Sequence, residues 1–215
     1  MSSIEDRQAR IESTLKLAPV VPVVVINDAD HAVALARALV AGGTPAIEVT
    51  LRTPAALAAI RRIAAEVEGA HVGAGTVLTG KDLDAAAEAG ATFAVSPGST
   101  PALLDAADAS GLPLLPGAAT ASEAMALLER GYRCMKFFPA AAAGGADLLR
   151  SLSGPLPGIR FCPTGGITAQ NAARYLALPN VACVGGSWLT PRKLLEAGDW
   201  AAVESLAREA AALRT

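Results

Sequence analysis

The amino-acid sequence predicts an α/β protein, a (β/α)8 TIM barrel with an extra helix at its N-terminus. Three observations predict this fold. Eight short apolar runs alternate with alanine-rich stretches of helical character, and the runs begin roughly 20 to 26 residues apart, the length of one βα unit. The runs are almost continuously apolar, as in parallel strands that are covered on both faces. Eight units without a long insertion favour a closed barrel over a doubly wound sheet.

The elements follow in order from the N-terminus. An amphipathic segment around residues 4–17 predicts the extra helix, to which we assign residues 1–17. The eight predicted strands are VPVVVI from residue 21, AIEVTL from 46, HVGAGTV from 71, TFAVSPG from 92, PLLPGA from 113, CMKFFPA from 134, RFCPTGG from 160 and VACVGGSWL from 181. No linker or low-complexity segment interrupts the series, so residues 1–215 are predicted to form a single domain.

Threonine–proline pairs and glycines predict where the helices between these strands begin and end. A capping residue followed by proline is typical of a helix start, and the pairs are Thr53-Pro54, Thr100-Pro101 and Thr190-Pro191. Glycine is typical of a helix end, and the candidates are Gly42, Gly90 and Gly131.

Charge and hydropathy narrow the class of partner. The net charge is only -2 and no block of like charges occurs, so we expect neither a nucleic-acid partner nor an anionic membrane surface. The most apolar early stretch, Leu17–Ile26, is too short to span a bilayer and contains two prolines. A small-molecule substrate is the expected partner.

The cysteines and histidines give no sign of a metal site. Three cysteines, Cys134, Cys162 and Cys183, lie singly in apolar runs without metal-ligand spacing, which is typical of reduced core thiols in a cytoplasmic protein. His31 and His71 are isolated from other ligand-type residues. We therefore expect no metal.

Lys136 is the most unusual residue of the predicted strands. The chain has 18 basic residues, of which only Lys16, Lys81, Lys136 and Lys193 are lysines, and Lys136 lies inside the apolar run CMKFFPA. An arginine would stay protonated, whereas a buried lysine can lose its proton and act as an amine nucleophile. The alternative is a lysine whose stem packs in the core while its head reaches the rim.

Glu48 and Arg52 give Lys136 a possible chemical context. In a (β/α)8 barrel, ligands bind at the carboxyl ends of the strands, where both residues are expected. Alternation along a strand puts Glu48, Thr50 and Arg52 on one face, where they could also form a structural ion pair. An amine, a carboxylate and a guanidinium suit a Schiff-base enzyme acting on a 2-oxo acid, with Phe137 and Phe138 excluding water around the amine.

Glycine pairs end the last two predicted strands. The pairs in TGGI and VGGSW, beside Thr164 and Ser187, leave backbone amides open to an anion, and barrels often bind phosphate at these loops. Neither motif contains a lysine or arginine, so binding through amide dipoles is expected. A P-loop-like stretch, GTVLTGKD from Gly75, is rejected because Asp82 replaces the hydroxyl that should hold magnesium.

The segments IEVTLRT, GAGTVL, SPG, LLPG, KFFPA, FCPTGGIT and CVGGSWL, in this order, closely resemble the 2-keto-3-deoxy-6-phosphogluconate (KDPG) and 4-hydroxy-2-oxoglutarate (KHG) aldolase family. The resemblance runs from Leu17 to the end of the chain. It implies a class I aldolase of the Entner-Doudoroff pathway, usually a homotrimer, that cleaves KDPG to pyruvate and glyceraldehyde 3-phosphate and often accepts KHG. It implies no cofactor.

The resemblance also implies roles for individual residues. Lys136 would form the Schiff base, Glu48 would be the general acid and base, and Arg52 with Thr76 would hold the carboxylate of pyruvate. The residues implied for the substrate phosphate are Gly165, Gly166, Gly186 and Ser187. One departure is Ala141, which stands where the family usually has a glutamate after KFFPA, and it changes the loop that follows this strand.

Two other classes of function remain open on the sequence. A phosphate-binding barrel isomerase or epimerase could use Glu48 without a covalent step, and Lys136 would then only neutralise a carboxylate. A non-catalytic assembly protein could retain the same barrel, because a fold does not determine function. Covalent trapping of a substrate on Lys136 separates these three classes.

Overall fold

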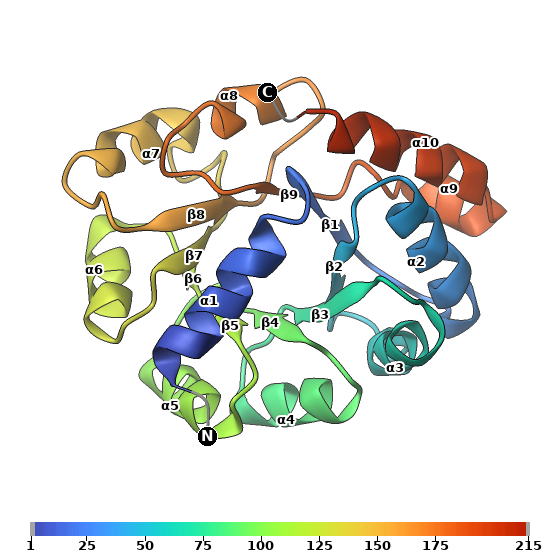
Figure 1. The fold of residues 1–215 in the computed structure, drawn as a ribbon, viewed down its shortest axis with the longest axis horizontal. Helices are drawn as coiled ribbons and strands as arrows, with labels where there is room; N and C mark the ends of the chain where they lie inside the picture. The colour runs from blue at the N-terminus through green and yellow to red at the C-terminus, as the bar shows by residue number, and fades with distance from the viewer. Residues whose placement is uncertain (1–2, 214–215) are drawn as a thin grey trace.

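A ring of parallel β-strands with α-helices around its outside forms the protein (Figure 1). The structure is a computed structural model and describes residues 3–213. The strands are β1 (Val20–Val24), β2 (Ala46–Thr50), β3 (His71–Gly75), β4 (Phe93–Val95), β5 (Leu114–Leu115), β6 (Gly117–Ala118), β7 (Cys134–Phe137), β8 (Arg160–Pro163) and β9 (Val184–Gly186). The helices are α1 (Ile4–Leu15), the 3-10 turn η1 (Ala29–His31), α2 (Ala32–Ala41), α3 (Ala56–Glu66), α4 (Gly80–Glu88), α5 (Pro101–Ser110), α6 (Ala121–Glu129), α7 (Gly145–Ser153), α8 (Ala172–Leu176), α9 (Arg192–Ala197) and α10 (Trp200–Ala211).

The strand order closes the ring and confirms the predicted (β/α)8 barrel. Six strands pair in the order β5-β4-β3-β2-β1-β9, and three pair in the order β6-β7-β8. Two parallel bridges, Phe161 with Val181 and Thr164 with Gly185, join β8 to the segment of β9. All strand pairs are parallel, so the carboxyl ends of the strands meet at one rim.

The fifth predicted strand is divided in two, which corrects the expectation of eight continuous strands. Pro116 separates β5 from β6 and has no N–H with which to continue the ladder. Below the proline, β5 pairs with β4, and above it β6 pairs with β7, in register Gly117 with Lys136. The carbonyl of Pro116 accepts a hydrogen bond from the backbone N–H of Lys136 at 2.9 Å, so the divided strand still joins the two sheets.

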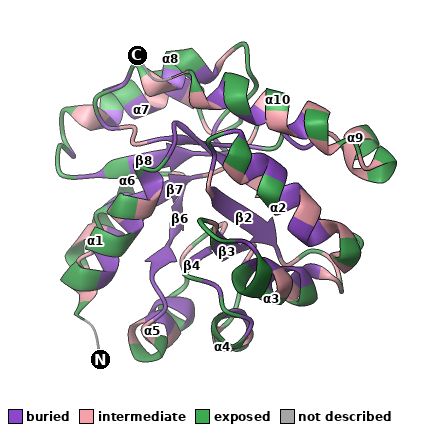
Figure 2. Ribbon diagram, turned by 45° about the vertical axis from the view of Figure 1, so that its right-hand side comes forward, coloured by how far each residue is buried: buried purple, intermediate pink, exposed green. Residues whose placement is uncertain are grey.

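Alternation along the strands divides the core into two layers. Side chains such as Ala46, Cys134 and Cys162 point into the ring, where they pack with Ile11 and Leu15 of α1. The intervening side chains point outward and pack against the surrounding helices in a larger cluster. Figure 2 shows this arrangement as buried strands inside and helices whose outer faces are exposed.

Helix α1 lies across the amino-terminal end of the ring (Figure 1) and confirms the predicted extra helix. The side-chain oxygen of Gln8 accepts hydrogen bonds from the N–H groups of Arg133 and Cys134, at 2.8 and 2.9 Å. Arg7 forms an ion pair with Asp108 of α5 at 2.7 Å. Of the predicted helical range 1–17, residues 1 and 2 lie outside the described residues, as do residues 214 and 215 of the predicted domain.

One of the three predicted threonine caps is confirmed. The hydroxyl of Thr100 accepts a hydrogen bond from Leu103 N–H at 3.2 Å at the start of α5. The prediction is wrong for Thr53, which donates to the carbonyl of Ile26 at 2.5 Å, while α3 begins only at Ala56. It is also wrong for Thr190, because Pro191 is the N-cap of α9. Both threonines instead form hydrogen bonds within loops at the carboxyl-terminal rim.

Candidate active site

Lys136 and Glu48 face each other inside the barrel. The Nζ atom of Lys136 on β7 lies 3.0 Å from Oε1 of Glu48 on β2, and both side chains are at most 6% exposed. The two residues are 88 positions apart in the sequence. The hydrogen bond is a route by which the carboxylate can take a proton from the ammonium group and leave a neutral amine. The pairing of Glu48 with Arg52 that strand alternation allowed is replaced by a pairing with Lys136.

Gly75 on β3 makes room for this pair. A Cβ atom at position 75 would lie 2.2 Å from Oε1 and 2.6 Å from Cγ of Glu48, closer than non-bonded atoms can approach. Sequence reasoning gave Gly75 no role in the site, although a glycine inside a strand is a signal of close approach. Any larger residue would push the carboxylate away from Lys136.

The aromatic surroundings of Lys136 differ from the sequence prediction. The ammonium group lies 5.3 Å from the ring centroid of Phe138, a cation–π distance. Phe137 points to the opposite side of β7, into the outer layer, where it packs edge-on against Phe161 at 6.1 Å. Only Phe138 therefore lies beside the amine, and the prediction for Phe137 is wrong because neighbouring strand residues face opposite ways.

Arg52 and Thr76 meet just beyond the ends of β2 and β3. The Nε–H of Arg52 donates a hydrogen bond to Oγ1 of Thr76 at 3.0 Å, and the guanidinium is exposed. Thr76 has φ of 60°, in the left-handed region that a non-glycine residue rarely adopts. Such backbone conformations often occur at functional sites. The two residues predicted to hold a carboxylate are thus adjacent at the rim.

The two glycine pairs also lie side by side. The bridge between Thr164 and Gly185 places the end of β8 next to the end of β9. Gly165 and Gly166 have φ values of 98° and 74°, which glycine adopts without strain. Gly186 is buried at the end of β9, and Ser187 is exposed directly after it. The structure therefore groups the four residues that the sequence suggested for phosphate.

The loop that carries Ala141 packs against the first glycine pair. The N–H of Ala141 donates to the carbonyl of Gly165 at 3.0 Å, and a Cβ atom on Gly166 would lie 2.5 Å from Cβ of Ala141. Ala141 is exposed. The loop at Ala141 thus borders the candidate phosphate loops.

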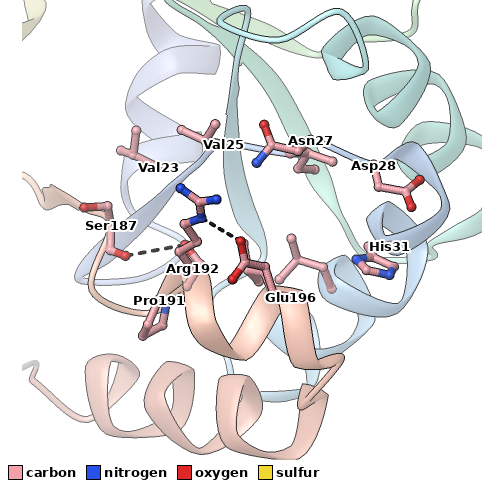
Figure 3. Close-up of a pocket in the computed structure, with 13 residues that line it drawn as sticks. Val23, Val25, Asn27, Asp28, His31, Ser187, Pro191, Arg192 and Glu196 are labelled. Carbon is pink, nitrogen blue, oxygen red and sulfur yellow. Dashed lines mark hydrogen bonds and ion pairs between the residues drawn. The ribbon is translucent and has the colours of Figure 1, made fainter.

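A cleft of about 920 Å³ opens between the end of β1 and the start of α9. Figure 3 shows Ser187 at one side of it, Arg192 and Glu196 on α9, and Asn27 and His31 on the opposite wall. Lys136 does not line the cleft. This cleft therefore adjoins the candidate phosphate loops at Ser187, and the buried amine lies elsewhere.

The cysteines and Ser96 are further nucleophile-type side chains buried in the barrel. Burial raises the pKa of the Cys134 thiol to about 12, so this thiol stays protonated and inert. Cys162 and Cys183 have their sulfur atoms 3.6 Å apart in the same inner layer. The hydroxyl of Ser96 is buried without a hydrogen-bond partner among the residues described.

The P-loop-like stretch has a structural explanation. Asp82 closes a capping box at the start of α4, where its carboxylate accepts from the N–H of Thr79 at 2.9 Å. Lys81 is exposed next to it. Within residues 3–213, no three histidine, cysteine or acidic side chains are grouped as metal ligands, and no helix has the length and hydropathy to cross a membrane.

A lysine amine beside a proton acceptor can add to the carbonyl carbon of a 2-oxo acid and form an imine. On a (β/α)8 barrel, this is the chemistry that class I aldolases use. Comparison with known proteins places the chain within that class. The family model for KDPG and KHG aldolases matches residues 11–206, and the chain belongs to this family.

Individual relatives agree with the family assignment. The chain is 54% identical over 199 residues to the KHG/KDPG aldolase of Escherichia coli (strain K12), and the match covers 93% of each chain. The KDPG aldolase of Zymomonas mobilis ZM4, solved with 3-phosphoglycerate, has a TM-score of 0.90 and 50% identity over 95% of this chain and 96% of its own. The KDPG aldolase of Legionella pneumophila, solved with pyruvate as a covalent carbinolamine, has a TM-score of 0.91 and 46% identity over 93% and 97%.

Proposed function

We propose that this protein is a class I aldolase that cleaves KDPG to pyruvate and glyceraldehyde 3-phosphate, and that it also accepts KHG. The observation that carries the proposal is the buried pair of Lys136 and Glu48, 3.0 Å apart inside the barrel. Membership of the KDPG and KHG aldolase family supports the choice of substrates.

Lys136 and Glu48 act in successive steps of the proposed reaction. Glu48 accepts a proton from Lys136, and the neutral amine adds to C2 of the substrate to give a carbinolamine. Glu48 returns that proton to the carbinolamine hydroxyl, which leaves as water and gives an iminium ion. Glu48 then takes the proton of the C4 hydroxyl while the C3–C4 bond breaks, which releases the aldehyde. The electrons of that bond remain on the imine as an enamine. Protonation at C3 and hydrolysis return pyruvate and the free amine.

Arg52 and Thr76 bind the carboxylate of the 2-oxo acid in this proposal. Their hydrogen bond holds the exposed guanidinium at the rim, on the same β2–β3 side of the barrel as Glu48. A guanidinium binds a carboxylate through two parallel hydrogen bonds. The glycine pairs and Ser187 bind the phosphate at the other end of the substrate.

Arg52→Ala is expected to weaken substrate binding more than turnover. Loss of a charge-assisted pair should raise KM for KDPG about ten- to a hundredfold, and kcat should fall much less. Steady-state kinetics measure both constants, with Arg61→Ala, an exposed arginine on α3, as the control. An unchanged KM would mean that another residue binds the carboxylate of the substrate.

Borohydride trapping tests the proposal itself. Incubation with pyruvate and sodium borohydride is expected to convert the imine on Lys136 to a stable secondary amine, which peptide mass spectrometry locates. An adduct on Lys81 or Lys193, or no adduct, would contradict the Schiff-base mechanism. It would favour an isomerase or epimerase without a covalent step, or a non-catalytic barrel.

We also propose that residues 1–215 act as one barrel domain, that the protein is a homotrimer, and that it works in the cytoplasm without a metal or cofactor. Resemblance to a family that is usually trimeric supports the oligomer. Three reduced cysteines support a reducing compartment. Light scattering during size-exclusion chromatography measures the oligomeric state, and a monomer would contradict this part of the proposal.

A further inference from the structure

The sequence motifs around the glycine pairs contain no lysine or arginine, but an arginine lines the same cleft as Ser187. Arg192 opens α9, five positions after Ser187, and both residues line the cleft of about 920 Å³. Figure 3 shows the guanidinium of Arg192 on the side of α9 that faces β1, between Ser187 and Asn27. Among the residues described around this cleft, Arg192 alone carries a fixed positive charge.

Glu196 orients this arginine without occupying all its donors. The Nε–H of Arg192 donates to Oε1 of Glu196 at 2.6 Å, one helical turn away. The two Nη atoms have no hydrogen-bond partner among the residues that the structure describes. Those nitrogens form the fork that binds two phosphate oxygens, and a guanidinium already held at Nε loses less rotamer entropy on binding.

The other ionisable groups of the cleft have contacts of their own, and the carboxylates of Asp28 and Glu196 keep their negative charges there. The carboxylate of Asp28 accepts a hydrogen bond from the N–H of Asp30 at 2.9 Å at the start of η1. His31 packs edge-on against Trp200 at 5.4 Å. The negative charge of Glu196 lies at the Nε edge of Arg192, away from the Nη edge, although it still reduces the net charge of the cleft.

We infer that Arg192 is a specificity-determining residue that binds the phosphate group of the substrate from the side of Ser187. The inference rests on the proposed aldolase function, whose phosphate loops it completes with a cation. The side chain of Arg192 is 83% exposed, so solvent screens its charge and the effect is moderate.

The test compares two substrates that differ only in the phosphate, KDPG and the same 2-oxo acid without its phosphate. Arg192→Ala should lower kcat/KM for KDPG about tenfold by raising KM, while kcat for KDPG changes by less than about twofold. For the unphosphorylated substrate, kcat/KM should also change by less than about twofold. The kcat/KM of Arg192→Lys for KDPG should lie between those of Arg192→Ala and the unmodified protein, because lysine retains the charge but lacks the two parallel donors. Lys193→Ala, which removes a neighbouring exposed cation outside the cleft, should change neither substrate.

The inference would be overturned if Arg192→Ala lowered kcat/KM equally for both substrates or did not lower it at all. It would also be overturned if Lys193→Ala had the same effect as Arg192→Ala. Titration calorimetry with inorganic phosphate keeps the test independent of catalysis. Arg192→Ala should weaken phosphate binding about tenfold, while unchanged binding would contradict the role of Arg192. Failure of the aldolase proposal would appear instead in the unmodified protein, as a missing pyruvate adduct.

Discussion

Replacing Lys136 with methionine is expected to lower kcat for KDPG cleavage by at least about 10⁴-fold, because no other described group near Glu48 can form an imine. Lys136→Arg is the more informative variant. It retains a cation beside Glu48 but supplies no amine nucleophile, so it should be equally inactive. Steady-state kinetics with KDPG and borohydride trapping with pyruvate measure the two consequences together.

Two controls make the Lys136 result specific. Lys81→Met and Lys193→Met remove exposed lysines and should retain full activity. Because removal of one partner from a buried ion pair destabilises a protein by about 3–5 kcal/mol, thermal unfolding of Lys136→Met should be recorded beside that of Lys136→Arg. Substantial activity in Lys136→Arg would mean that the residue only neutralises charge, as in a non-covalent isomerase.

Glu48→Gln is expected to lower kcat by roughly 10² or more, since an amide can accept the hydrogen bond of Lys136 but cannot exchange protons with the substrate. The variant retains the size of the side chain against Gly75, where the contact is closest. KM should change little, because neither end of the substrate is bound by Glu48.

Glu48→Asp provides the matched control for this prediction. It keeps the carboxylate but shortens its reach to Lys136 by one methylene group, so its activity should lie between those of the glutamine variant and the unmodified protein. Near wild-type turnover in Glu48→Gln would mean that another group carries the protons.

The repeated βα pattern was sufficient to predict the barrel, the approximate positions of most of its strands and the two strands that carry Lys136 and Glu48. Spacing could not predict the division of the fifth strand, because it depends on which neighbours Pro116 meets on either side. The pairing of Lys136 with Glu48 joins residues 88 positions apart, and only the closed ring fixes that contact. Alternation alone would have placed Phe137 away from the amine.

The cleft beside Ser187 could not be predicted from the sequence, for a different reason. Its walls come from the segments after β1 and β9, at opposite ends of the chain, which become neighbours only when the barrel closes. Within a single motif, Arg192 reads as an ordinary residue at a helix start. Its inferred role depends on the loop between Ser187 and Pro191, where Thr190 N–H donates to the carbonyl of Ser187 at 3.2 Å.

Helix α1 gives the barrel the form of a cup. Ile11 and Leu15 join the inner layer around Cys134 and close the lower mouth with a packed floor, and Lys136 stands one layer above that floor. Substrate, water and both products must therefore use the single upper mouth. In the proposed reaction pyruvate stays attached to Lys136 as an enamine while the aldehyde leaves, so both fragments depart through the same mouth, one after the other.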